Sequence, residues 1–247
     1  MSSSLTQRLL SQSKEDYAAA TTHPFLVSAG KLTLSPQALQ SWLAQDRFYA
    51  LLGYTKFLGR LIARMPSPEE DPDTLASKQQ RRRLAILAGA MANIDREVAF
   101  FEDVARENGL DLAAKPRDGS IDAVSDKTKA YRDFMVATAA EGTFEEGLVL
   151  LWAMEKVYLD AWTHASTFLP SGSTAEDSLS PGVKRALVQL IPNWSAPGFV
   201  SFVRDIADLV DELASEDKND RLLEQASKIW RQTLKHEVGF WETAGQL

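Results

Sequence analysis

Residues 150–162 read LLWAMEKVYLDAW, a helix-forming segment with one carboxylate on its apolar face. With 100° between consecutive residues of a helix, several large apolar side chains lie on one face, within about 60° of Leu148. These residues are Leu148, Leu151, Trp152, Leu159 and Trp162. Glu155 falls near the centre of that face, whereas Lys156 and Asp160 lie together on its flank, one turn apart. Because a lone buried carboxylate is costly to ionise, we expect Glu155 to be paired, hydrogen-bonded or raised in pKa.

The helical period extends along nearly the whole chain, and period-2 strands are absent from the sequence. The helical segments run over about 4–20, 36–65, 74–108, 123–141, 143–168, 180–192, 197–214 and 218–243. Ser35-Pro36 is typical of a helix start, and Thr143 with Glu146 forms a capping-box pattern. Breaks rich in Pro, Gly, Ser and Asp fall at 65–73, 108–120 and 169–182, and none resembles an interdomain linker. The pattern predicts an all-α fold: one domain, residues 1–247, built as a helical bundle.

Composition narrows the class of protein. Among the 247 residues, 45% are hydrophobic and 25% charged, with a formal net charge of −7. The negative charge disfavours nucleic acid and anionic membranes as partners, and we interpret the basic run KQQRRR at 78–83 as a solvated helix start. No cysteine is present, which excludes disulfides, thiolate metal sites and a cysteine nucleophile. With no apolar run of membrane-spanning length and no signal-peptide pattern, we expect a cytoplasmic protein.

Two further acids lie on aromatic helix faces. Asp46 shares a face with Trp42 and Tyr49, and Glu237 shares one with Trp230 and Trp241. Acids are almost never fully buried unless paired, so three such cases call for a joint explanation. They could be three separate structural pairs. Alternatively, they could form one pocket inside the bundle, where aromatic walls and carboxylates would suit a heteroaromatic amine.

The sequence offers little evidence for a metal site, a haem site or a nucleophilic serine. The three histidines are His23, His164 and His236, and neither an HExxH nor an ExxH pair occurs. His23 lies near a helix start, where a capping or structural role is expected. There is no GxSxG motif. We therefore expect no metal and no cofactor, with a metal-dependent reaction as an alternative.

Motifs spread over most of the chain resemble the TenA family, the thiaminase II group of thiamin salvage proteins. HPFLVSAGKLTLSPQALQSWLAQDRFY at 23–49 is similar to the family's opening signature, and DKTKAYRDFM at 126–135 to its tyrosine segment. NWSAPGFVSFV at 193–203 and HEVGFWETA at 236–244 resemble its late aromatic turn and closing motif. The resemblance implies the helical fold shared with haem oxygenase, a small-molecule pyrimidine substrate and a homo-oligomer.

One departure places the chain in a particular branch of that family. Met154 stands four residues before Tyr158, where the cysteine-bearing branch has its nucleophile. Trp152, Ala153, Glu155 and Tyr158 instead resemble the WAxE..Y segment of members that lack the cysteine. That branch is associated with hydrolysis of aminopyrimidines or their N-formyl derivatives.

The resemblance also implies roles for single residues. Asp46 and Tyr49 match the family's pyrimidine-binding acid and tyrosine, Tyr131 its mid-chain tyrosine, and Glu237 its proton-transfer glutamate. Glu155 would be the branch's substitute catalytic acid or base. We therefore expect Asp46, Glu155 and Glu237 to be catalytic, with either glutamate as the acid. The expected substrate-binding residues are Tyr49, Tyr131, Trp152, Tyr158 and Trp194.

Two other classes of function stay open at this point. The pocket could hold a pyrimidine or another amine without turning it over, as a binding protein. The chain could also be a metal-dependent oxygenase of the same superfamily fold.

Overall fold

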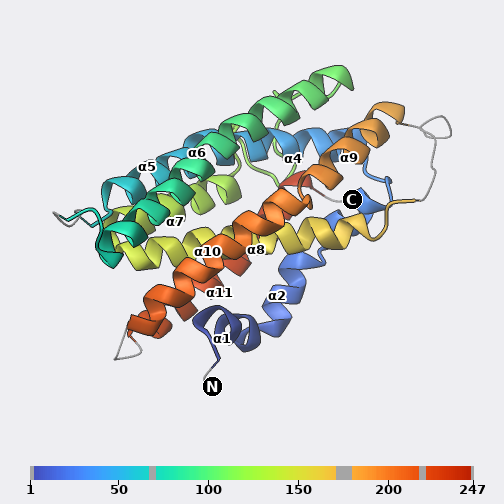
Figure 1. Ribbon diagram of the computed structural model, residues 1–247. Coiled ribbons are helices and arrows are strands. Elements are labelled where there is room, and N and C mark those ends of the chain that lie inside the picture. Colours follow the sequence, from blue (N-terminus) through green and yellow to red (C-terminus); the bar gives the residue numbers. More distant parts are fainter. Residues whose placement is uncertain (1–2, 67–70, 171–179, 217–220, 246–247) are drawn as a thin grey trace.

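Helix α8, Phe144–Ser166, runs through the middle of the molecule, and most other helices pack around it (Figure 1). The computed structural model describes residues 3–66, 71–170, 180–216 and 221–245. Helix α8 begins with the expected capping box, in which Thr143 Oγ1 accepts from the Glu146 N–H and Glu146 Oε2 accepts from the Thr143 N–H. It packs against α2, α3, α5, α7, α9, α10 and α11. The opening segment of the sequence is therefore the centre of the fold.

All regular elements in the described segments are helical, as the sequence predicts. The first four helices are α1 (Leu5–Gln12), α2 (Lys14–Thr21), α3 (Pro24–Gly30) and α4 (Pro36–Phe48). The π-helix η1 (Tyr49–Tyr54) joins α4 to α5 (Thr55–Ala63). The remaining elements are α6 (Leu75–Glu107), α7 (Asp126–Glu141), α8, α9 (Pro181–Asn193), α10 (Pro197–Glu216), α11 (Arg221–Trp241) and the 3₁₀ turn η3 (Glu242–Ala244). Within the described segments, no helix combines the length and apolarity that crossing a bilayer requires.

The structure differs from the predicted segments in two places near the N-terminus. The predicted helix 4–20 is two helices, because Ser13 leaves helical geometry (φ −132°, ψ 49°) and ends α1. Helix α3 is not among the predicted segments, since its seven residues are too few to show a period. His23 caps α3 as expected, its Nδ1 accepting from the Phe25 N–H at 3.2 Å. The breaks predicted at 65–73 and 169–182 lie partly outside the described residues, at 67–70 and 171–179.

The π-helix η1 interrupts what the sequence predicts as one long helix over 36–65. It packs closely on α7: a Cβ at Gly53 would lie 2.5 Å from Met135 Cε, so a larger residue would require the Met135 side chain to move. A π-helix bonds residue i to i+5, and single π-turns occur frequently at functional sites. Here the π-turn begins at Tyr49 and ends at Tyr54, two tyrosines of the same cavity wall.

An aromatic cluster fills the bundle beside this wall. Trp42 stacks on Trp241 with ring centroids 5.7 Å apart, and Trp162 lies 4.5 Å from Trp194. Both Trp42 and Trp241 are fully buried. The Trp241 Nε1–H donates to the Ala20 carbonyl at 2.8 Å, which fastens α11 to the end of α2. A rigid aromatic layer therefore supports the helices that carry the candidate site.

Candidate active site

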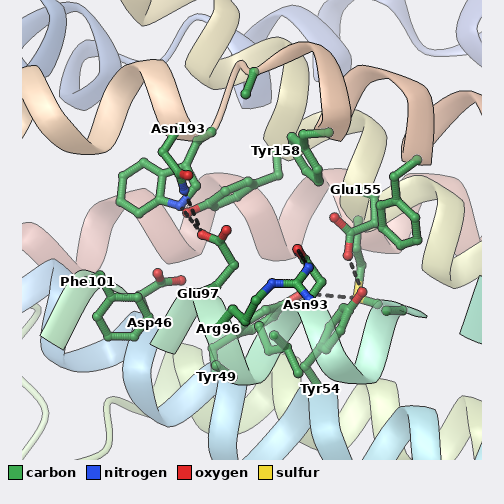
Figure 2. A pocket seen from close by; sticks show the side chains of 18 of the residues that line it. Asp46, Tyr49, Tyr54, Asn93, Arg96, Glu97, Phe101, Glu155, Tyr158 and Asn193 are labelled. Atoms are coloured by element: carbon green, nitrogen blue, oxygen red, sulfur yellow. Dashed lines mark hydrogen bonds between the residues drawn. The ribbon is translucent and has the colours of Figure 1, made fainter. Parts of the chain in front are cut away.

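A cavity of about 430 Å³ lies inside the bundle. Its walls come from α4, η1, α6, α7, α8, α10, α11 and the end of α9, so residues far apart in sequence meet there (Figure 2). Gly89, Gly198 and Phe202 line both this cavity and a more open groove between α6 and α10. We infer that the cavity opens to solvent through this groove.

Seven of the eight residues expected from the sequence line this one cavity. They are Asp46, Tyr49, Tyr131, Glu155, Tyr158, Trp194 and Glu237. The three acids thus face a common space. Their catalytic and binding roles stay a prediction.

Trp152, which the sequence places among the expected substrate-binding residues, does not line the cavity. Its side chain is 1% exposed and stacks on Trp230 of α11, with ring centroids 5.2 Å apart. Trp152 precedes Glu155 by three residues, so the two side chains diverge by about 60° around the helix. That angle directs Trp152 into the packing with α11 instead of into the cavity.

Two of the three acids accept a hydrogen bond from a tyrosine. The Tyr131 hydroxyl donates to Glu237 Oε1 at 2.6 Å. The Tyr54 hydroxyl donates to a Glu155 oxygen (Figure 2). The Tyr49 hydroxyl contacts Met154 Sδ at 3.3 Å. The ends of the π-turn therefore reach two consecutive residues of α8, and Tyr54 fixes the orientation of the Glu155 carboxyl.

Asp46 differs from the other two acids. Its side chain is 7% exposed and faces the cavity, and no residue in the described part of the chain donates a hydrogen bond to its carboxyl. A buried polar group without a protein partner is costly, so the Asp46 carboxyl depends on solvent or on a bound molecule in the cavity for its hydrogen bonds.

Burial raises the pKa values of all three acids into the range around neutral pH. Burial, with the nearby Glu97 charge, raises the pKa of Asp46 to about 8. Burial raises the pKa of Glu155 to about 7, against the opposing effect of the Tyr54 hydrogen bond. Burial raises the pKa of Glu237 to about 8, with Asp46 and Glu155 adding to the rise. Such pKa values suit proton transfer at neutral pH, because a general acid or base works best when its pKa lies near the working pH.

Sequence reasoning missed five polar residues of the cavity, which are Tyr54, Asn93, Arg96, Glu97 and Asn193. On a regular α-helix, with about 100° per residue, the Tyr54 side chain would not lie on the same face as that of Tyr49. The π-turn between the two residues brings both to one wall of the cavity. Glu97 lies on α6 among other charged residues, so nothing in its pattern marks it as facing inward. Asn193 ends α9, and its Nδ2 donates to Glu97 Oε2 at 2.8 Å.

The histidines lie at the margin of the site or away from it. His236 stacks on Tyr131 with ring centroids 5.0 Å apart, behind the cavity wall. His164 lies edge-on to Phe168 near the end of α8, outside the cavity. In the part of the chain that the structure describes, no three metal-ligating side chains come together closely enough to hold a metal ion.

The chain matches the model of the TENA/THI-4/PQQC family over residues 10–246. It is 31% identical to a "probable transcription factor" of Fusarium pseudograminearum over 96% of the chain and 52% of that protein, so it spans about half of the Fusarium protein's length. It is also 21% identical to a "probable bifunctional TENA-E protein" of Glycine max, over 96% of this chain and 91% of that one.

Solved structures show the same fold. A TenA homologue of Pyrococcus furiosus superposes with a TM-score of 0.77 at 22% identity, covering 97% of this chain and 99% of that one. A putative TenA-like thiaminase of Sulfolobus solfataricus superposes with a TM-score of 0.65 at 14% identity, covering 97% and 94% of the two chains. Family and fold therefore agree with the resemblance seen in the sequence.

Proposed function

We propose, since this chain belongs to the TENA/THI-4/PQQC family, that it is a hydrolase of thiamin-pyrimidine salvage. Its substrate would be an aminopyrimidine: 4-amino-5-aminomethyl-2-methylpyrimidine or the N-formyl derivative. The reaction would use carboxyl groups for acid–base catalysis, because the chain has no cysteine to act as nucleophile.

The observation that carries this proposal is the meeting of Asp46, Glu155 and Glu237 in one aromatic cavity. Around the carboxyls stand the rings of Tyr49, Tyr158 and other aromatic residues, which offer flat surfaces to a planar ring. A volume of about 430 Å³ is within the range of small-molecule sites. The cavity therefore matches a flat heterocycle that carries amino groups.

Each carboxyl has a distinct proposed task. Asp46 pairs with the amidine edge of the pyrimidine, where a ring nitrogen and an amino group lie side by side. Glu155 has the lowest pKa of the three, about 7, and takes a proton from the attacking water. Glu237, with a pKa of about 8, keeps its proton at neutral pH and gives it to the departing amine.

The proposed reaction of the free amine balances with water alone. The water oxygen forms a bond to the exocyclic carbon, the carbon–nitrogen bond breaks, and ammonia leaves with the proton from Glu237. The products are ammonia and the hydroxymethylpyrimidine. With the N-formyl derivative, water attacks the formyl carbon and releases formate and the free aminopyrimidine. Tyr54 and Tyr131 act as positioning residues by holding the two glutamates.

The assay that tests this function gives the purified chain both pyrimidines and measures ammonia and formate, with boiled protein as the control. We expect protein-dependent release of one of the two products. Calorimetric titration with the same compounds runs beside the assay. Binding without turnover would replace the hydrolase with a binding protein, and the absence of both would remove pyrimidines from consideration.

Replacing Tyr54 with phenylalanine should shift the acid limb of the pH–rate profile. The Tyr54 hydroxyl lowers the pKa of Glu155, so its removal raises that pKa and requires a higher pH to deprotonate the base. A hydrogen bond to a charged group is worth about 1.5–3 kcal/mol, and one pKa unit corresponds to about 1.4 kcal/mol. We therefore expect kcat/KM to fall below neutral pH and its acid limb to move up by about one pH unit.

Tyr17→Phe is the matched control. The Tyr17 hydroxyl also donates to a carboxyl of α8, that of Asp160, but both residues lie outside the cavity. This control should leave the position of the acid limb unchanged. If both variants shift the limb equally, or Tyr54→Phe does not shift it, Tyr54 has no role in positioning the base.

A further inference from the structure

Glu97 presents a fixed carboxyl to the cavity, with one oxygen engaged and the other uncommitted. Its Oε2 accepts from Asn193 Nδ2 at 2.8 Å and from Trp194 Nε1 at 3.2 Å. In the described chain no hydrogen bond reaches Oε1. Because two donors at the end of α9 bind the same oxygen, the carboxyl cannot turn freely. The uncommitted oxygen is therefore held as an acceptor in the cavity wall.

This carboxyl acts electrostatically on two of the other acids of the site. Figure 2 shows Glu97 between Asp46 and Glu155, and its charge acts on both of those groups. Asp46 is 7% exposed and has no protein donor among the described residues. Asp46 and Glu97 thus offer two unsatisfied acceptor positions to one ligand. Arg96 also lines the cavity, but its guanidinium bonds the Asn93 side chain at 2.9 Å.

Asp46 by itself cannot distinguish an amino from an oxo substituent. A protonated carboxyl donates through its O–H and accepts through its carbonyl oxygen. It therefore pairs with the ring nitrogen and amino group of an aminopyrimidine, and equally with the oxygen and ring N–H of an oxopyrimidine. Discrimination requires a second group whose hydrogen-bonding character is fixed.

Glu97 is such a group. Burial raises its pKa, while the hydrogen bonds from Asn193 and Trp194 and the charge of Arg96 oppose that rise. Both donors bind Oε2, and in its carboxylate form the group presents Oε1 to the cavity as an acceptor only. An oxo oxygen placed against it would meet a second acceptor.

We propose that Glu97 is a specificity-determining residue that accepts a hydrogen bond from an exocyclic amino group on the ring of the ligand. The site then takes amino-substituted heteroaromatic rings and rejects their oxo counterparts. This inference rests on the proposed function, because it presumes a pyrimidine ring in the cavity. It adds which ring substituent is selected and by which residue.

Glu97→Gln is a specific test because it changes one cavity-facing atom from a hydrogen-bond acceptor to a donor. Asn193 and Trp194 both donate, so they retain the amide oxygen of glutamine as their acceptor. The amide nitrogen then faces the cavity as a donor, where Oε1 was an acceptor. Binding is measured by calorimetry with 4-amino-2,5-dimethylpyrimidine and with 2,5-dimethylpyrimidin-4-one, a pair that differs in the substituent at the 4-position and in the proton on the adjacent ring nitrogen. Neither carries a leaving amine, so binding is measured without turnover.

We expect the wild-type chain to bind the amino ring at least ~30-fold more tightly than the oxo ring, since a site built for an N–H rejects analogues that lack it. In Glu97→Gln this preference should fall at least ~10-fold, with the amino ring bound more weakly and the oxo ring more tightly. Glu97→Asp keeps an acceptor and should still prefer the amino ring. Glu107→Gln, an exposed charge change on the same helix, should bind both rings as the wild type does.

An equal loss of affinity for both rings in Glu97→Gln, or an unchanged preference, would overturn the inference and leave Glu97 as a support for Asn193 and Trp194. The proposed function fails separately, when the wild type neither binds the amino ring nor hydrolyses the aminomethylpyrimidine. Wild-type hydrolysis together with an unchanged preference in Glu97→Gln removes this inference alone. If Glu97→Gln does not fold, the test rests on Glu97→Asp. A Glu97→Asp protein that binds the oxo ring as tightly as the amino ring contradicts the role proposed for Glu97.

Discussion

Glu155→Gln is expected to lower kcat/KM for the aminopyrimidine by about 10²–10⁴-fold, the usual contribution of one general acid or base. Glutamine has the shape of glutamate and can still accept the hydrogen bond from Tyr54, but it cannot take a proton from water. The measurements are steady-state release of ammonia or formate and calorimetric binding of 4-amino-2,5-dimethylpyrimidine. Affinity for this unreactive ring should stay within a few-fold of wild type, because Asp46 and the aromatic walls are unchanged.

The control for this variant is Glu145→Gln, which removes the same charge from the first turn of α8, outside the cavity. It should retain wild-type activity. A folded Glu155→Gln protein with full activity would show that Glu155 is not the base. An equal loss of rate and of ring affinity would instead assign Glu155 to binding.

The three acids could be found in the sequence because each violates the polarity of an otherwise apolar helix face. Asp46, Glu155 and Glu237 lie on three helices, and the rule that buried acids need partners marks all of them. A helical wheel of one segment does not show which neighbouring helix a given face packs against. Trp152 falls on the same face as Glu155, yet the packing of α8 against α11 takes Trp152 onto Trp230.

The residues that sequence reasoning missed depend on tertiary structure. On a regular helix, Tyr54 would lie about 140° from Tyr49, on the far side. The π-turn between them changes that angle and places both in the cavity wall. Glu97 becomes part of the site only because the end of α9 brings Asn193 and Trp194 against it. Neither the π-turn nor the position of α9 follows from the local pattern.

Glu237→Gln is expected to have two opposite effects: a loss of activity and a gain in stability at alkaline pH. Loss of the proposed proton donor should lower kcat/KM by about 10²–10⁴-fold. The gain in stability follows from the pKa of Glu237, which burial raises from its ordinary value of 4.5 to about 8. A carboxyl that resists ionisation in the folded chain destabilises that chain whenever the pH favours ionisation.

The pH window follows from those two pKa values. Below pH 4.5 the carboxyl is protonated in the folded and unfolded chains alike, so it does not affect stability. Between 4.5 and about 8 the unfolded chain releases the proton while the folded chain keeps it, so the free energy of unfolding falls as the pH rises. Above about 8 the loss is complete, at most about 5 kcal/mol at 1.36 kcal/mol per pKa unit.

Thermal melts of wild type and Glu237→Gln at pH 5 and pH 9 measure this effect. Glutamine carries no charge and still accepts from Tyr131, but its amide N–H groups need acceptors of their own, which removes part of the gain. We expect the variant to melt several degrees higher than wild type at pH 9, with a much smaller difference at pH 5. Glu242→Gln, whose carboxyl pairs with Lys127 at the surface at 2.6 Å, should show no such gain.

A Glu237→Gln protein that melts below wild type at pH 9 would mean that the Glu237 carboxyl stabilises the fold. It would then be a structural acid paired with Tyr131, and its place in the cavity would need another explanation. A Glu237→Gln protein that is more stable and less active would show that the Glu237 carboxyl lowers the stability of the fold and contributes to activity. Such a combination is common for functional residues. Because the cost arises from burying an ionisable group beside Asp46 and Glu155, a cationic ligand that pairs with these acids should reduce it. Binding of the aminomethylpyrimidine, through its protonated side-chain amine, should therefore raise the melting temperature of the wild type more at pH 9 than that of Glu237→Gln.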